Sequence, residues 1–243
     1  MKSYTIHLIR HGISEGNLKR QYIGSTDSPL SKQGAEEIRK KDAEGAYPGA
    51  GLFFCSPMRR CRETMKLIYP DVEPEIIEDF RECDFGDWEG KTAAELENDP
   101  EYRRWIDNHQ GEGGGIATPP NGESGGVFMQ RTCMAFEKLV ERMLRSGKTS
   151  AVVVAHGGTI MSILSTYGLP RAKFYEWMTE PGGGYSLRII PGLWMRDMVA
   201  EVYDTIPPRK EEGRECTIVD YAREAAAEAF KGYLPEEDTE NKA

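Results

Sequence analysis

Basic and imidazole side chains follow three apolar runs of this sequence. The first run, residues 3–9, ends in Arg10-His11-Gly12, and the other two end in Ser56–Arg60 and in His156-Gly157-Gly158. Ligands of an open α/β sheet bind beyond the carboxyl ends of its strands, so we expect these groups at one sheet edge. Two imidazoles and at least two guanidiniums repel one another there unless an anion is bound. The pattern therefore predicts an anion-binding active site.

A phosphoryl group is the anion that suits these residues best. Arginines bind its oxygens bidentately, and backbone N–H groups at a helix start, such as that of Gly157, add to the field. A neutral His11 imidazole can attack phosphorus in line and hold it covalently. The other ring nitrogen of His11 then needs an acceptor, for example a backbone carbonyl near the turn. A protonated His156 would stabilise charge on the equatorial oxygens.

The leaving alkoxide also needs a proton donor, and Glu82 is the candidate. A carboxyl group partly shielded beside Phe85 and Trp88 can have a raised pKa. It can then act as a general acid toward the leaving group and as a base toward water. Asp84 and Glu89 are nearby alternatives that the spacing leaves open.

The order of the predicted elements indicates the fold class. Strands are predicted at residues 3–9, 52–55, 76–77 and 150–155. Helices are predicted after the N-cap Ser31, after residues 56–64, in two pieces of 92–109 broken near Pro100, after the N-cap Ser124, at 159–167 and at 217–232. This alternation implies right-handed crossovers and helices on both faces of a sheet. We predict a three-layer α/β/α fold with a mainly parallel sheet.

The C-terminal part of the sequence predicts an antiparallel edge and a tail. Residues 185–190 and 198–203 read as a hairpin at the sheet edge, with Pro191-Gly192 in its turn. We expect residues 1–234 to form one domain and the acidic residues 235–243 to be disordered. The stretch 108–122 is dense in glycine and proline and is a candidate lid.

Composition excludes several classes of function. The net charge of −9 argues against broad attraction to nucleic acid or to an anionic membrane. No run approaches the roughly 18 apolar residues of a membrane span. The five cysteines are odd in number and include no CxxC pair, which is typical of reduced thiols in a cytoplasmic protein.

Metal chemistry at this site is not indicated by the sequence. His11 and His156 lack ligand spacings such as H-x-H or H-E-x-x-H. We therefore expect no metal site and no cofactor. The expected ligand is a small molecule, and the sequence leaves the oligomeric state open.

Several blocks, in order from residue 6 to about residue 160, resemble the histidine phosphatase superfamily, also called the phosphoglycerate mutase-like family. Arg10-His11-Gly12 corresponds to the RHG motif of that family. Asp27–Gly34 resembles its D-x-P-L-[ST]-x-x-G block, Ser56–Thr64 its S-x-L-x-R-A-x-x-T block, and Phe85–Gly90 its F-G-x-W-E-G block. Short motifs match by chance when taken singly, whereas several in the right order are specific.

The resemblance implies a phosphoglycerate mutase-like fold and a role for each matching residue. His11 would be the nucleophile and Glu82 the proton donor. The residues implied on the phosphate are Arg10, Asn17, Arg60 and His156. The departures from the family pattern are Met58, Cys61 and Glu63, which stand where leucine, alanine and glutamine are commoner.

The block Arg81–Gly86 distinguishes two branches of the family. Mutases carry E-R-H-Y-G there, whereas this chain resembles the phosphatase branch, which includes alpha-ribazole phosphatase. We therefore expect hydrolysis of a small phosphomonoester. One alternative is phosphoglycerate mutase-type transfer. Another is a non-catalytic module that binds phosphorylated ligands, although loss of His11 or Glu82 would mark such a module and both are present.

Overall fold

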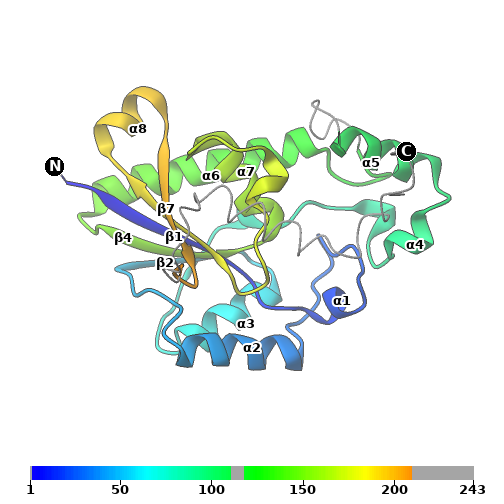
Figure 1. Cartoon of the computed structure of the whole chain (residues 1–243), viewed down its shortest axis with the longest axis horizontal. Helices are drawn as coiled ribbons and strands as arrows, with labels where there is room; N and C mark the ends of the chain where they lie inside the picture. Colours follow the sequence, from blue (N-terminus) through cyan, green and yellow to red (C-terminus); the bar gives the residue numbers. More distant parts are fainter. Residues whose placement is uncertain (1, 111–117, 210–243) are drawn as a thin grey trace, which may run out of the picture.

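The computed structural model describes residues 2–110 and 118–209, and within them seven strands form one sheet in the order β3-β2-β4-β1-β6-β7-β5 (Figure 1). The strands are β1 (Tyr4–Arg10), β2 (Leu52–Cys55), β3 (Glu75–Ile76), β4 (Ser150–Ala155), β5 (Gly168–Leu169), β6 (Gly184–Ile189) and β7 (Ala200–Ile206). β1, β2, β3 and β4 pair in parallel, while β6 is antiparallel to both β1 and β7. The predicted, mainly parallel sheet is confirmed.

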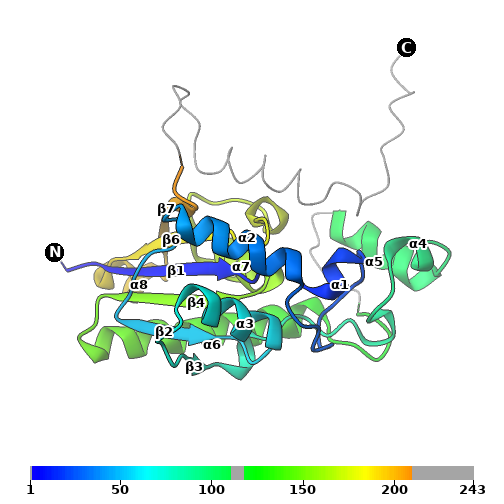
Figure 2. The ribbon, with the colours of Figure 1, turned by 90° about the horizontal axis from the view of Figure 1, so that it is seen from below.

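Helices cover both faces of the sheet, as predicted. They are α1 (Glu15–Leu18), α2 (Lys32–Ala43), α3 (Arg59–Ile68), α4 (Ala93–Leu96), α5 (Pro100–Gln110), α6 (Gly125–Ser146), α7 (Gly157–Tyr167) and α8 (Pro191–Asp197). Three short 3-10 helices span Glu78–Phe80, Gly86–Trp88 and Phe174–Trp177. α2 and α3 lie on one side of the sheet and α6 on the other (Figures 1 and 2).

The central strand β4 shows why the sequence folds in three layers. Val152, Val153 and Val154 are all fully buried. Val152 and Val154 pack in one apolar cluster with residues of α2 and α3, while Val153 packs in another with residues of α6 and α7. A parallel strand covered on both faces reads as a continuous apolar run, which is what residues 151–155 are.

Two details at the C-terminal side of the sheet differ from the prediction. The two predicted strands do pair antiparallel, as β6 and β7. Pro191-Gly192 does not form their turn but begins α8, because proline is well suited to the first position of a helix. β7 is not the edge strand either, since β5 pairs with its outer side. The predicted helix 217–232, the tail 235–243 and residues 111–117 of the candidate lid lie outside the described residues.

β1 points toward the end of the molecule where α1, α4 and α5 lie (Figure 2). A separate apolar cluster forms there around Trp88, Leu96 and Tyr102. Because β2 and β4 run parallel to β1, the carboxyl ends of all three strands face this end of the molecule. In the described parts of the chain, every helix is too short or too polar to cross a membrane.

Candidate active site

His11 lies immediately after β1, with its backbone N–H donating to the carbonyl of Ala155 at the end of β4 (2.9 Å). Its side chain is 5% exposed, and Nδ1 is 2.7 Å from the carbonyl oxygen of Gly12. A carbonyl only accepts, so Nδ1 carries the proton and Nε2 keeps its lone pair. Burial, followed by the nearby charges of Arg60 and Arg10, holds the pKa of His11 well below its usual range. The ring is therefore a neutral imidazole whose Nε2 carries the lone pair that a nucleophile needs.

His156 follows β4 in the same way and is fully buried. Its ring centroid is 5.1 Å from that of His11, so the structure brings the two predicted imidazoles together. Nε2 of His156 lies 2.7 Å from Oγ of Ser56, which follows β2. Burial lowers the pKa of His156 well below its usual value, and Arg60 lowers it further. The protonated form considered from the sequence is therefore disfavoured in this structure.

Arg60, on the first turn of α3, is 1% exposed. Its two Nη atoms donate to the carbonyls of Thr26 and Gly24, at 3.0 Å each. Among the described residues its Nε has no hydrogen-bond partner, although it is buried. Leaving a buried N–H unsatisfied costs about 1–3 kcal/mol. A phosphoryl oxygen next to His11 is an acceptor that would remove this cost.

Arg10 and Gly157 lie against each other beside the histidines. A Cβ atom built on Gly157 would be 3.4 Å from Nε of Arg10. Nη1 of Arg10 donates to the carbonyl of Thr179 at 2.5 Å, which orients the guanidinium. Because Gly157 is the first residue of α7, its N–H points out of the helix start, where anions bind.

Glu82 is brought to the start of α7. Its Oε1 accepts the backbone N–H of Cys83 and its Oε2 accepts that of Gly158, both at 3.0 Å. A Cβ atom on Gly158 would lie 2.3 Å from Oε1, so only glycine permits this approach. Burial raises the pKa of Glu82, against the opposing effects of these two N–H groups and of Arg60 and Arg10. A raised pKa favours the protonated acid that a general-acid step needs.

One aromatic ring beside Glu82 was not among those predicted. The same hypothetical Cβ on Gly158 would lie 3.1 Å from Cε1 of Phe128, on α6, which places that ring next to the carboxyl. Phe85 and Trp88, the two rings predicted beside Glu82, pack in the cluster at α4 and α5, where both contact Trp105.

The two alternative acids are engaged in holding loops. Asp84 Oδ1 accepts the hydroxyl of Ser25 and the N–H of Gly86, both at 2.9 Å. The carboxylate of Glu89 accepts four backbone N–H groups, from Gly24, Ser25, Thr26 and Phe85. These contacts use Asp84 and Glu89 as loop anchors and favour Glu82 as the donor.

Asn17 is used partly for local structure. Its amide oxygen accepts the N–H and the hydroxyl of Ser14, at 3.2 and 2.9 Å, and so completes the N-cap of α1. Its amide NH₂ group is the part suited to a phosphate oxygen, and that role stays a prediction.

Thr64 has a positioning role that the sequence analysis missed. Its Oγ1 accepts the N–H of Gly12 at 3.0 Å and donates to the carbonyl of Arg60 at 2.7 Å. Thr64 thus joins the turn after β1 to the first turn of α3. It stands in the block Ser56–Thr64, but spacing alone gave no reason to assign it a contact.

Cys61 also lies in the site, with Sγ 3.5 Å from Nε2 of His156. Burial raises the pKa of its thiol to about 12, so the thiol stays protonated. Among the described residues, no group of three or more His, Cys, Asp or Glu side chains is arranged to hold a metal ion.

Residues 6–199 of the chain match the histidine phosphatase superfamily (branch 1). The chain is 26% identical over 192 residues to the adenosylcobalamin/alpha-ribazole phosphatase of Salmonella typhimurium, covering 76% of this chain and 91% of that protein. It is 31% identical over 170 residues to a 2,3-bisphosphoglycerate-dependent phosphoglycerate mutase of Parvibaculum lavamentivorans, covering 65% of this chain and 76% of that protein.

Solved structures show the same fold. The alpha-ribazole phosphatase from Shigella flexneri superposes with a TM-score of 0.69 at 24% identity, covering 87% of this chain and 99% of that chain. A phosphoglycerate mutase from Thermus thermophilus gives a TM-score of 0.57 at 27% identity, covering 83% of this chain and 98% of that chain. The family match spans most of the sequence, and the fold agrees with it. The chain therefore belongs to the histidine phosphatase superfamily.

Proposed function

We propose that this protein hydrolyses a small phosphomonoester through a phosphohistidine formed on His11. The observation that carries the proposal is the neutral, buried imidazole of His11, whose Nδ1 donates to Gly12 and whose Nε2 is left as nucleophile. The charges of Arg10 and Arg60, which act on both histidines, give a phosphoryl group a binding site there. Hydrolase relatives in the same family support this assignment.

The first chemical step transfers the phosphoryl group to the enzyme. Nε2 of His11 attacks phosphorus while the bond from phosphorus to the leaving oxygen breaks, and the protonated carboxyl of Glu82 gives its proton to that oxygen. Arg60 donates its buried Nε–H to a phosphoryl oxygen. A bound phosphate dianion opposes the desolvation of His156 and favours its protonated form in the complex.

The second step releases phosphate. A water molecule gives a proton to the carboxylate of Glu82 and attacks phosphorus, and the bond from phosphorus to Nε2 of His11 breaks. Glu82 is then protonated again and His11 is neutral, so the cycle closes. Both steps use the same carboxyl, as microscopic reversibility favours for an acid that later acts as a base.

Hydrolysis is preferred to mutase chemistry because of the block Arg81–Gly86, which resembles the phosphatase branch. Relatives named as mutases are also similar to the chain, so mutase activity is the second candidate. The preference for a small ester over nucleic acid follows from the net charge of −9 and remains a prediction. A cytoplasmic location is likewise proposed from the pattern of cysteines.

The direct test is phosphate release from a panel of phosphomonoesters and bisphosphates, with EDTA present throughout. We expect release to continue in EDTA, because His11 supplies the nucleophile and Arg60 the charge that a metal would otherwise supply. In a parallel assay with 3-phosphoglycerate as substrate and 2,3-bisphosphoglycerate as primer, isomerisation should be no faster than hydrolysis. Activity that is lost in EDTA and restored by a divalent ion would contradict the mechanism, and faster isomerisation than hydrolysis would establish the mutase.

A further inference from the structure

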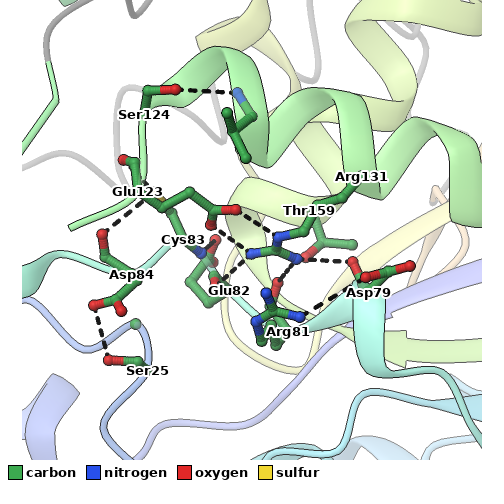
Figure 3. A network of polar contacts seen from close by, with 12 residues as sticks. Ser25, Asp79, Arg81, Glu82, Cys83, Asp84, Glu123, Ser124, Arg131 and Thr159 are labelled. Carbon is green, nitrogen blue, oxygen red and sulfur yellow. Dashed lines mark hydrogen bonds and ion pairs between the residues drawn. The ribbon is translucent and has the colours of Figure 1, made fainter.

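The side chain of Arg131, on α6, contacts the segment that carries Glu82. Its Nε and Nη2 form a bidentate pair with the carboxylate of Glu123, at 2.7 Å each. Nη1 donates to the carbonyls of Asp79 (2.8 Å) and Arg81 (2.9 Å), and Nη2 donates to that of Glu82 (3.0 Å). A guanidinium has five N–H donors, and these five contacts use all of them. Figure 3 shows this arrangement.

The Arg131–Glu123 pair lies largely out of water, with the two side chains 11% and 12% exposed. Breaking such a pair leaves a poorly solvated charge, whereas a surface pair contributes little. The guanidinium also lies over the ring of Phe128, 5.0 Å from its centroid, and that ring borders the carboxyl of Glu82. Arg131 therefore contacts both the main chain of Glu82 and the ring that shields its side chain.

The segment held by Arg131 has no regular structure of its own beyond residue 80. Residues 81–85 belong to neither a helix nor a strand. Oγ1 of Thr159, on α7, donates to the carbonyl of Phe80 at 3.2 Å. Four consecutive carbonyls, those of residues 79–82, thus accept hydrogen bonds from two side chains, Arg131 and Thr159. These contacts replace the hydrogen bonds that a helix or a sheet would supply.

The turn 119–123, which ends in Glu123, also holds the chain that follows Glu82. Its backbone N–H donates to the carbonyl of Asp84 at 2.8 Å, and the N–H of Asp87 donates to the carbonyl of Pro120 at 2.9 Å. A Cβ atom on Gly122 would lie 2.6 Å from the carbonyl oxygen of Asp84, so the two backbones are in direct contact. The turn 119–123 and Arg131 together hold the chain on both sides of Glu82.

We propose that Arg131, oriented by Glu123, is a positioning residue for the proton donor Glu82. Arg131 reaches the main-chain carbonyl of Glu82, while the carboxyl oxygens are held by the N–H groups of Cys83 and Gly158. It therefore acts by fixing where the carboxyl lies. This inference rests on the proposed function, because it takes Glu82 to be the donor.

The test is Arg131→Lys, which keeps the charge and loses the planar five-donor geometry. We expect kcat for an alkyl phosphate to fall by about 10- to 100-fold, since small displacements of a catalytic group cost that much. The fall should be smaller for an aryl phosphate, whose leaving group needs little protonation. The matched control is Arg142→Lys on the same helix. Arg142 pairs with Glu75 at the surface, and this variant should keep the wild-type rate on both esters.

A double-mutant cycle with Glu82→Gln separates positioning from a general loss of structure. If Arg131 acts through Glu82, Arg131→Lys should cause no further loss of kcat once Glu82 is replaced. The same further loss in both backgrounds, or equal losses on alkyl and aryl esters, would overturn the inference. If Arg131→Lys proves too unstable to measure, Glu123→Gln provides a milder version of the same change.

A measurement independent of activity distinguishes this inference from the proposed function. Amide hydrogen exchange of Gly158 and Cys83 reports whether the carboxyl of Glu82 stays in place. Arg131→Lys should speed exchange at both amides and leave Gly12, held by Thr64, unchanged. Unchanged exchange at Gly158 and Cys83 would refute the positioning role, whatever the protein's activity. Faster exchange in a protein without phosphatase activity would confirm the positioning and refute the function.

Discussion

The His11→Ala variant is expected to lose at least about 10⁴-fold in kcat for phosphate release, because it removes the nucleophile on which both chemical steps depend. The fold should persist, since His11 lies after the end of β1 and its Nδ1 bonds to the carbonyl of the next residue, Gly12. Steady-state phosphate release measures the loss. Circular dichroism and thermal unfolding of the same preparation establish that the variant is folded.

His7 provides the matched control for this experiment. It is a buried histidine on β1, the strand that His11 follows, and its Nδ1 lies 2.9 Å from Oγ of Ser186 on β6. Burial lowers its pKa to about 4, so it too is a neutral imidazole near pH 7. His7→Asn should keep kcat within a few-fold of wild type per folded molecule. Near-wild-type activity in His11→Ala would remove the proposed mechanism.

The Glu82→Gln variant is expected to lose about 10²- to 10⁴-fold in kcat for an alkyl phosphate and much less for an aryl phosphate. Glutamine keeps the size of the side chain and an acceptor for Gly158 but has no acidic proton. The rate of hydrolysis of an ester with a good leaving group depends little on that proton. Comparing the two esters therefore isolates the general-acid step, and Glu89→Gln is the control. Glu89 anchors a loop, so its loss should slow both esters to a similar extent.

The pH dependence of Glu82→Gln gives the same assignment a second readout. Glu82 must be protonated to donate, and its pKa is raised, so general-acid activity persists below that raised value and falls as the pH rises through it. His11 must be neutral, and its lowered pKa keeps the imidazole neutral to a lower pH than that of an ordinary histidine. Wild type should therefore show a basic limb in kcat/KM that Glu82→Gln lacks. If Glu89→Gln instead slowed the alkyl phosphate much more than the aryl phosphate, Glu89 would be identified as the donor.

The parts of the fold that sequence predicts well are those set by local chemistry. The side-chain oxygens of Ser31 and Ser124 accept N–H groups in the first turns of α2 and α6, as their predicted N-cap positions indicate. The run 151–155 is apolar throughout because both faces of β4 are covered. Pro191 misled the prediction because proline suits both a turn and the start of a helix, and only the following residues' packing decides between them.

The active site, too, could be predicted from the sequence only in part. His11 and His156 meet because β1 and β4 are neighbours in the sheet, and parallel strands bring their carboxyl ends to one edge. The surroundings of Glu82 could not be predicted, because Phe128 and Gly158 come from two helices far along the chain. Arg131 is 49 residues from Glu82 in sequence, and no local pattern connects an arginine on one helix with a carbonyl so distant.

The most direct test of the central claim is to trap the phosphorylated enzyme. A rapid quench under alkaline conditions, which preserve phosphohistidine, during turnover of an aryl phosphate should yield protein carrying one phosphoryl group. Peptide mass spectrometry should place that group on His11, and His11→Ala should carry none. Glu82→Gln should accumulate more of the labelled protein than wild type, because the base that activates water is missing. Turnover without a phosphorylated protein, or a phosphoryl group on a residue other than His11, would contradict the account.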